Sequence, residues 1–134
     1  MHSDFEILSN RLFAIVKPVL EEHGKALPVG AVVTLAGAIE IVTAGGSGDS
    51  TSEEVVQQIL IKLRVKHHIR ACAFLYTGTI ELSSSGKTEV LCVQAETADC
   101  QAIAIVMPYR KLPSGRYSYQ DLILKPGTCN VFPQ

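Results

Sequence analysis

Several features that indicate a known chemistry are missing from this sequence. None of its four cysteines forms a CxxC pair, which argues against a zinc ribbon and against a thioredoxin-type redox site. The four histidines lie at the N-terminus, near the end of the first predicted helix and as a pair among basic residues. These positions indicate surface and capping roles rather than a base that activates a nucleophile. The sequence therefore predicts no catalytic residue, no metal site and no cofactor.

A surplus of charge of either sign is also missing. The formal net charge at pH 7 is -1, which gives no whole-molecule field that would attract nucleic acid or an anionic membrane. A nucleic-acid contact would have to be local, and its candidates are also the bases that satisfy a helix C-terminus: Lys62, Arg64, Lys66 and Arg70. Nucleic acid is therefore disfavoured as a partner.

The N-terminal stretch lacks the basic segment and apolar run of a signal peptide. Residues 3–23 carry acidic and basic side chains throughout, so this stretch is neither a signal peptide nor a membrane span. We expect a cytoplasmic protein with no membrane partner.

What the sequence does contain is a large apolar fraction. Hydrophobic residues make up 47% of the 134 residues, and the length is usual for one domain. We expect a single domain over residues 1–134 with a substantial core, and part of the apolar surplus in a subunit interface.

The first amphipathic segment covers residues 3–23. Its apolar side chains recur three, four and seven positions apart, and a capping box of Ser3 with Glu6 predicts its start. Gly24 predicts its end, while Pro18 predicts a kink or an early stop near Lys17.

The remaining elements are a hairpin, a second helix and a run of strands. Residues 31–42 are typical of a hairpin that reverses at Gly37, and a helix is predicted from Glu53 to about His68. From Ile69 the period changes to two, which predicts four strands joined by short turns, at 69–82, 87–96, 101–109 and 117–124. The predicted fold is α+β, in the order α-β-β-α-β-β-β-β, with two helices packed on an antiparallel sheet of five or six strands.

The cysteines divide into two pairs by their setting. Cys72 and Cys92 fall inside apolar strand-like runs, which favours free thiols in the core. Cys100 and Cys129 lie near predicted turns, and the sequence leaves a disulfide between them open, although a cytoplasmic location disfavours one.

The Gly/Ser loop at residues 45–52 has some of the features of a phosphate site. It matches neither GxGxxG nor GxxxxGK[ST], it has no lysine, and Asp49 and Glu53 place negative charge where a phosphate would sit. A capping box of Ser50 with Glu53, or of Thr51 with Glu54, would occupy the first amides of the helix instead. We favour this interpretation, while a mobile loop stays compatible with another ligand.

The turn at residues 109–119 combines tyrosine and arginine, the residue types that anchor interfaces and stack on planar or anionic ligands. The alternative is a hairpin turn at residues 113–115 flanked by cross-strand tyrosines and ordinary surface bases. The candidate binding residues are Tyr109, Arg110, Lys111, Arg116, Tyr117 and Tyr119.

The stretch LPVGAVVTLAGAIEIV, between two predicted helices, and the later IRACAFL resemble the first half of the cytidine deaminases. That family needs a His or Cys followed by Ala-Glu at the start of its second helix and a later PCxxC to hold zinc. Here the second helix begins DSTSEEVV, so Glu53 or Glu54 could occupy the place of the acid, but the zinc ligands are missing. Zinc deamination is therefore disfavoured.

A second resemblance covers nearly the whole chain. The motifs at Pro28 to Ala31, Ala71 to Tyr76, Pro108-Tyr109 and Phe132-Pro133 resemble those of a family of small bacterial single-domain proteins with no established activity. This resemblance implies a shared fold. The order of elements is also similar to the profilin and roadblock architecture, whose product is a binding or dimerisation module.

The predicted function is that of a non-catalytic interaction or dimerisation module, with a homodimer formed through an exposed sheet face or edge, or with another protein as partner. The alternative is a small-ligand binder or an enzyme that uses the Gly/Ser loop 45–52 and the Tyr/Arg turn 109–119.

Overall fold

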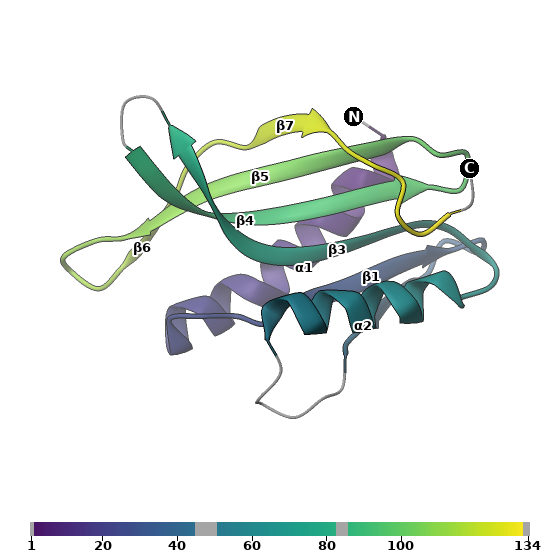
Figure 1. The fold of residues 1–134 in the computed structure, drawn as a ribbon, viewed down its shortest axis with the longest axis horizontal. Coiled ribbons are helices and arrows are strands. Elements are labelled where there is room, and N and C mark those ends of the chain that lie inside the picture. Colours follow the sequence, from purple (N-terminus) through teal and green to yellow (C-terminus); the bar gives the residue numbers. More distant parts are fainter. Residues whose placement is uncertain (1, 45–50, 83–85, 133–134) are drawn as a thin grey trace.

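The computed structural model describes residues 2–44, 51–82 and 86–132, which form two helices and one seven-stranded sheet (Figure 1). The predicted α+β class and the order of elements are confirmed. The elements are α1 (Ser3–His23), β1 (Val29–Thr34), β2 (Ile39–Val42), α2 (Ser52–Arg64), β3 (Ile69–Leu82), β4 (Gly86–Thr97), β5 (Ala102–Lys111), β6 (Tyr117–Tyr119) and β7 (Ile123–Pro126).

The strands lie in the order β2-β1-β3-β4-β5-β6, and every neighbouring pair is antiparallel. The last predicted strand, 117–124, is divided into β6 and β7, which both pair with β5. Because β4 occupies the other edge of β5, β6 and β7 follow one another along one edge. The amide of Gln120, between them, donates to the carbonyl of Pro108 at 2.8 Å.

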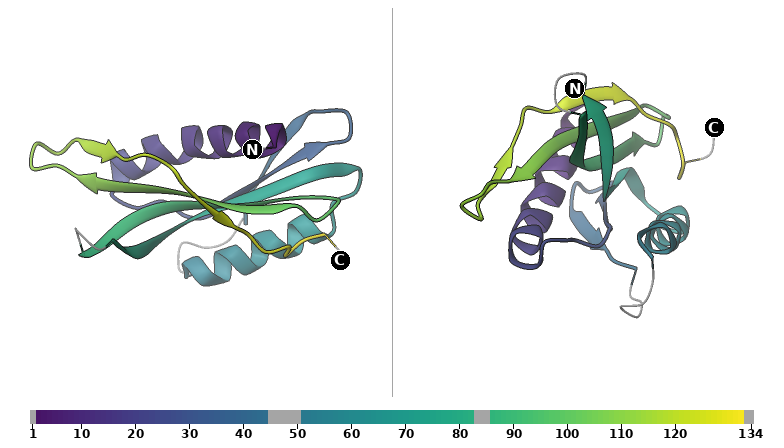
Figure 2. Two further views of the ribbon diagram at one scale, coloured as in Figure 1. Left: turned by 90° about the horizontal axis from the view of Figure 1, so that it is seen from above. Right: turned by 60° about the vertical axis from the view of Figure 1, so that its left-hand side comes forward.

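The two helices cover opposite faces of the sheet (Figure 2). Successive side chains of a strand point to opposite faces, so alternate residues of one strand serve different helices. In β3, Ala73 and Leu75 belong to the core under α1, whereas Cys72 and Phe74 belong to the core under α2. The apolar runs are therefore strands that are buried on both sides.

Helix α1 begins differently from the prediction and continues further. The N-cap is His2, whose Nδ1 accepts the amide of Asp4 at 3.0 Å, so the Ser3–Glu6 capping box is wrong. An imidazole nitrogen here does what a hydroxyl usually does at an N-cap.

The predicted early stop at Pro18 is also wrong, since the helix continues to His23. Pro18 and Ala14, whose carbonyl loses its donor, are both exposed, so water can solvate that carbonyl. The predicted end is confirmed: Gly24 adopts φ 74 and its amide donates to the carbonyl of Leu20 at 2.7 Å.

Helix α2 is shorter than predicted, because it ends at Arg64 instead of His68. The β-branched Val65 forms the C-cap, and His68 adopts a positive φ of 60. The carbonyl of His68 accepts the amide of Leu35 at 2.7 Å, so the residues after α2 tie the chain to the β1–β2 hairpin. The periodicity could not show this tertiary contact.

The close contact between α2 and β1 yields a test. A Cβ at Gly30 would lie 2.8 Å from Cγ2 of Ile59, a core residue of α2, whereas a Cβ at Gly78 in β3 would lie 4.0 Å from its nearest neighbour. We expect Gly30→Ala to lower the free energy of unfolding by about 1–3 kcal/mol through overpacking. The matched Gly78→Ala should be neutral or stabilising by up to about 1 kcal/mol. Urea unfolding measures both, and equal effects would contradict the packing.

Candidate binding groove beside the second helix

The three tyrosines of the predicted Tyr/Arg turn lie together on the face of the sheet that α1 covers. The ring of Tyr109 lies 6.1 Å from that of Tyr117 and 6.4 Å from that of Tyr119. The hydroxyl of Tyr119 donates to Glu21 in α1 at 3.2 Å, and Lys17 lies 4.5 Å from the centre of its ring. Tyr109 and Tyr119 are cross-strand partners, as the hairpin alternative proposed, while the packing of this cluster against the C-terminal half of α1 was not predicted.

The basic residues of the same turn are exposed. Arg110 and Lys111 border a hollow that Tyr109 and Glu89 also line, whereas Arg116, Tyr117 and Tyr119 do not line it. The six candidate residues therefore share one hairpin, and the structure brings three of them, Tyr109, Arg110 and Lys111, to one hollow.

The Gly/Ser loop is the other sequence candidate, and its residues 45–50, including Asp49 and Ser50, lie outside the described residues. Thr51 is the N-cap of α2: its Oγ1 accepts the amide of Glu54 at 3.2 Å and donates to the carboxylate of Glu54 at 3.1 Å. The predicted N-cap at Thr51 and its pairing with Glu54 are confirmed, although the carboxylate of Glu54 accepts the hydroxyl of Thr51 and not its amide. The carboxylate of Glu54 is thus hydrogen-bonded to the N-cap, whereas Glu53 borders a groove beside α2.

This groove has a volume of about 510 Å³ and lies between α2, the middle of β3 and β4, and the residues after β7. Its walls are largely apolar, with a few polar groups among them, as in many small-molecule sites. The lining residues are Ser52, Glu53, Val56 and Leu60 of α2, Phe74, Tyr76 and Thr77 of β3, Gln94 of β4, and Thr128 and Asn130.

The floor of the groove combines an aromatic pair with a hydrogen bond. The rings of Phe74 and Tyr76 are stacked, with centroids 5.8 Å apart. The amide of Gln94 donates to the hydroxyl of Tyr76 at 3.3 Å and fixes the orientation of that ring. Burial raises the pKa of Tyr76, so its hydroxyl stays protonated and remains a donor at neutral pH.

Sequence reasoning did not identify the groove residues of β3, β4 and the C-terminal end as a site. Tyr76 and Gln94 lie in alternating strands that looked like core, and 18 positions separate them. The one available signal was that a tyrosine and a glutamine interrupt the apolar faces of two neighbouring strands. Nothing indicated that residues 128–130 return to the same face.

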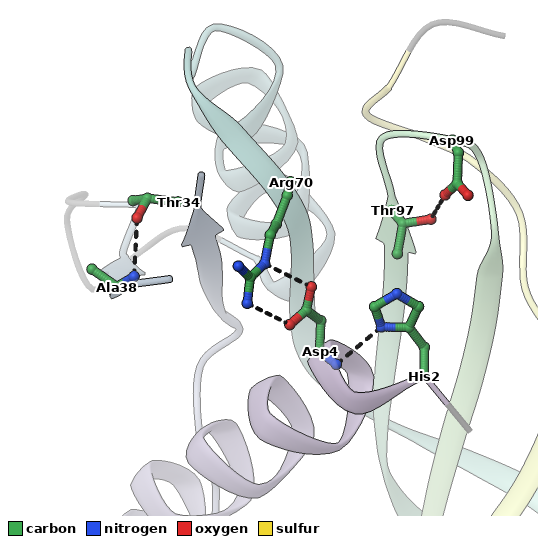
Figure 3. A network of polar contacts seen from close by, with 7 residues as sticks. All are labelled: His2, Asp4, Thr34, Ala38, Arg70, Thr97 and Asp99. Carbon is green, nitrogen blue, oxygen red and sulfur yellow. Dashed lines mark hydrogen bonds and ion pairs between the residues drawn. The ribbon is translucent and has the colours of Figure 1, made fainter. Parts of the chain in front are cut away.

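A second polar cluster lies where α1 begins (Figure 3). Arg70 of β3 donates from two nitrogens to the two carboxylate oxygens of Asp4, both at 3.0 Å, and Asp4 is 4% exposed. Thr97 donates to Asp99 in the turn after β4. The bidentate ion pair joins the start of α1 to the start of β3, which is a structural role.

The four bases that the sequence offered for a local nucleic-acid contact all have partners in the fold. Besides Arg70, Lys62 donates to the carbonyls of Thr43 and Ala44, at 2.7 and 2.9 Å. The other two bonds are those of Arg64 to the carbonyl of Asn130 at 2.9 Å and of Lys66 to Glu40 at 3.4 Å.

The cysteines follow the predicted division. Cys72 and Cys92 are buried free thiols, and burial raises the pKa of both. The question left open for Cys100 and Cys129 is answered by a disulfide between them. Among the described residues, no three His, Cys, Asp or Glu side chains are grouped so that they could hold a metal ion. Neither of the two described helices has the combined length and hydrophobicity of a membrane span.

The tyrosine cluster predicts a loss of stability in alkali. Burial, and then the neighbouring carboxylates of Glu89 and Glu21, raise the pKa of Tyr109 and of Tyr119 to about 12. A phenol in the unfolded chain ionises near pH 10. The unfolded state therefore loses protons first, and these tyrosines should lower the free energy of unfolding as the pH rises from about 10 to about 12, with no effect below that range.

Urea unfolding at several alkaline pH values measures this decline. In the double variant Tyr109→Phe, Tyr119→Phe the decline should be shallower than in the wild type. An identical slope would show that the two phenols are not buried as described.

Neither protein-family models, nor curated proteins, nor solved structures gave a match to this chain. The two resemblances drawn from sequence motifs therefore stay hypotheses.

Proposed function

We propose that this protein is a non-catalytic binding domain and that the groove beside α2 holds a small ligand. The observation that carries the proposal is the groove of about 510 Å³, with a stacked aromatic pair on its floor and a few polar groups converging on it. Sites for small molecules typically have this size and this mixture of apolar walls and few polar groups.

The lining favours a small aromatic ligand that is neutral or carries an amine. Phe74 and Tyr76 offer ring faces, and Val56 and Leu60 offer an apolar wall. Glu53 is the one charged side chain among the described residues of the lining, so an amine is favoured over a carboxylate.

The same lining supports binding rather than catalysis. The described lining residues include no histidine, cysteine or lysine, so none of them supplies the imidazole, thiolate or amine on which most nucleophilic sites rely. The polar pair on the floor, Tyr76 and Gln94, is already joined by a hydrogen bond.

Indole fluorescence offers a direct test, because the chain contains no tryptophan. Tryptamine has about a dozen heavy atoms, so at about 0.3 kcal/mol per atom we expect a Kd on the order of 1 mM. Val56→Phe fills the groove and should weaken binding at least about tenfold. The matched variant Ile61→Phe, at an exposed position of α2 outside the groove, should bind as the wild type does. Equal affinities of the two variants would contradict the site.

The sign of the ligand charge is tested with two indoles. Tryptamine should bind several-fold more tightly than indole-3-acetate, and Glu53→Gln should remove most of this difference. Glu54→Gln alters the neighbouring carboxylate, which is hydrogen-bonded to the N-cap Thr51. This variant should keep the difference in affinity between the two indoles. If indole-3-acetate binds more tightly, the amide groups at the start of α2 outweigh Glu53 and the proposed ligand class is wrong.

The second candidate function is homodimerisation through β7. Leu124 of this strand is 52% exposed and Leu122, just before it, is 42% exposed, and β7 pairs with β5 and with no other strand of the described residues. A second copy could extend the sheet there with its own β7. Light scattering across a concentration series should show a dimer that Leu124→Lys dissociates and Leu27→Lys, at an exposed position before β1, does not. A monomer at all concentrations would remove this candidate.

A cytoplasmic location is part of the same proposal and rests on the mixed charges of residues 3–23. A Cys100–Cys129 bond that persists in protein prepared from cells would instead favour a more oxidising compartment.

A further inference from the structure

The C-terminal segment, residues 127–132, follows β7 and crosses to the face of the sheet that carries α2 (Figure 2). It contains no helix or strand. Val131 and Phe132 pack against the core under α2, and Thr128 and Asn130 line the groove. The C-terminal segment is therefore a wall of the proposed binding site.

One buried carboxylate holds the end of this segment. Glu96 of β4 is 3% exposed, and its Oε1 accepts the amides of Asn130 at 2.7 Å and Val131 at 2.9 Å. Its Oε2 accepts the amide of Phe132 at 3.1 Å. Hydrogen bonds to an ionised acceptor are the stronger kind, and a buried carboxylate needs such partners.

A covalent link holds the same segment one residue earlier. Cys129 forms a disulfide with Cys100, in the turn between β4 and β5. Both residues are half-buried, so a small dithiol can reach the bond. Cys72 and Cys92 are buried and their raised pKa keeps them protonated, so exchange is confined to the one bond.

The disulfide adds to the contacts that keep the segment in place. Ordering six residues without secondary structure costs conformational entropy at every residue, and the three hydrogen bonds to Glu96, the bond from Arg64 to the carbonyl of Asn130 and the packing of Val131 and Phe132 offset this cost. A bond that keeps Cys129 beside the β4–β5 turn limits the freedom of the released segment and shifts this balance toward the ordered state.

We propose that thiol–disulfide exchange at Cys100–Cys129 controls the groove by holding or releasing the C-terminal segment. A thiolate of an incoming dithiol attacks one sulfur, which breaks the Cys100–Cys129 bond, forms a mixed disulfide and releases the other cysteine. The second thiolate of the dithiol then attacks the dithiol's own sulfur in the mixed disulfide and releases the remaining cysteine. The dithiol leaves as a cyclic disulfide, and both cysteines become thiols with the two electrons and two protons that it gave up. The segment then separates from Glu96, and the groove loses the wall formed by Thr128 and Asn130. The effect on ligand binding rests on the proposed function, whereas the release of the segment does not.

Hydrogen exchange measures the release without any ligand. The protein is oxidised until mass spectrometry shows one disulfide. Half of the sample is then reduced with dithiothreitol, and the other half is kept oxidised. We expect the amides of residues 130–132 to exchange at least about tenfold faster after reduction, while those of α1 and β3 keep their protection. Unchanged protection of residues 130–132 in fully reduced protein would overturn the proposal.

Tryptamine fluorescence measures the effect on the groove. Reduction should weaken tryptamine binding about tenfold, and the double variant Cys100→Ser, Cys129→Ser should match the reduced protein and ignore dithiothreitol. Ile61→Phe, at an exposed position of α2 outside the groove, should respond to dithiothreitol as the wild type does. If the double variant does not fold, the dithiothreitol titration of the wild type carries the test.

The two proposals fail in different ways. Faster exchange at residues 130–132 with no tryptamine binding in either state supports the release and contradicts the proposed ligand site. Tryptamine binding that is equal before and after reduction contradicts the control of the groove.

Discussion

The length of β3 relative to the two helices is the constraint on which the rest of the structure depends. Its 14 residues extend over about 46 Å, whereas the 21 residues of α1 extend over about 32 Å and the 13 residues of α2 over about 20 Å. Helix α1 therefore covers most of one face, and α2 covers less than half of the other. The remaining apolar side chains of that second face must be shielded from water by other parts of the chain. Ile80 and Ile123 supply part of this shield by packing over Val90, Cys92 and Val106.

The C-terminal segment lies beside α2 on the same face, because Val131 and Phe132 pack against the core under α2, and the groove lies between this segment and α2. A segment without secondary structure has backbone amides that a buried position must satisfy. Glu96 does this for three consecutive residues, which explains why a carboxylate is buried in β4. The groove thus depends on this one carboxylate, which holds the segment that faces α2.

The fold could be predicted from the sequence because its signals are local. Alternating apolar residues gave the strands, and the spacing of Leu8, Leu12 and other apolar residues gave α1. Gly24 and Gly37 marked their turns, and both adopt positive φ. The errors in the helices lie at their ends, whose positions depend on residues outside the periodic pattern. The His2 side chain caps the start of α1, and a hydrogen bond from the amide of Leu35 to the carbonyl of His68 holds the chain after α2.

The site could not be predicted because it depends on the register between strands and on where the chain returns. Tyr76 pairs with Cys92, and this register places Gln94 diagonally opposite the tyrosine, within reach of its hydroxyl. A shift by one residue would have turned Gln94 to the face of α1. The tyrosines of the hairpin show the converse: their proximity followed from a local turn, but whether they face solvent or α1 depended on the position of a helix about 100 residues earlier in the chain. Glu96 shows the same dependence: β4 contains two acids, Glu89 and Glu96, and the sequence does not tell that only Glu96 is buried against the returning segment. A buried carboxylate in a strand therefore indicates that some other segment must supply its donors, and in this chain that segment also forms a wall of the groove.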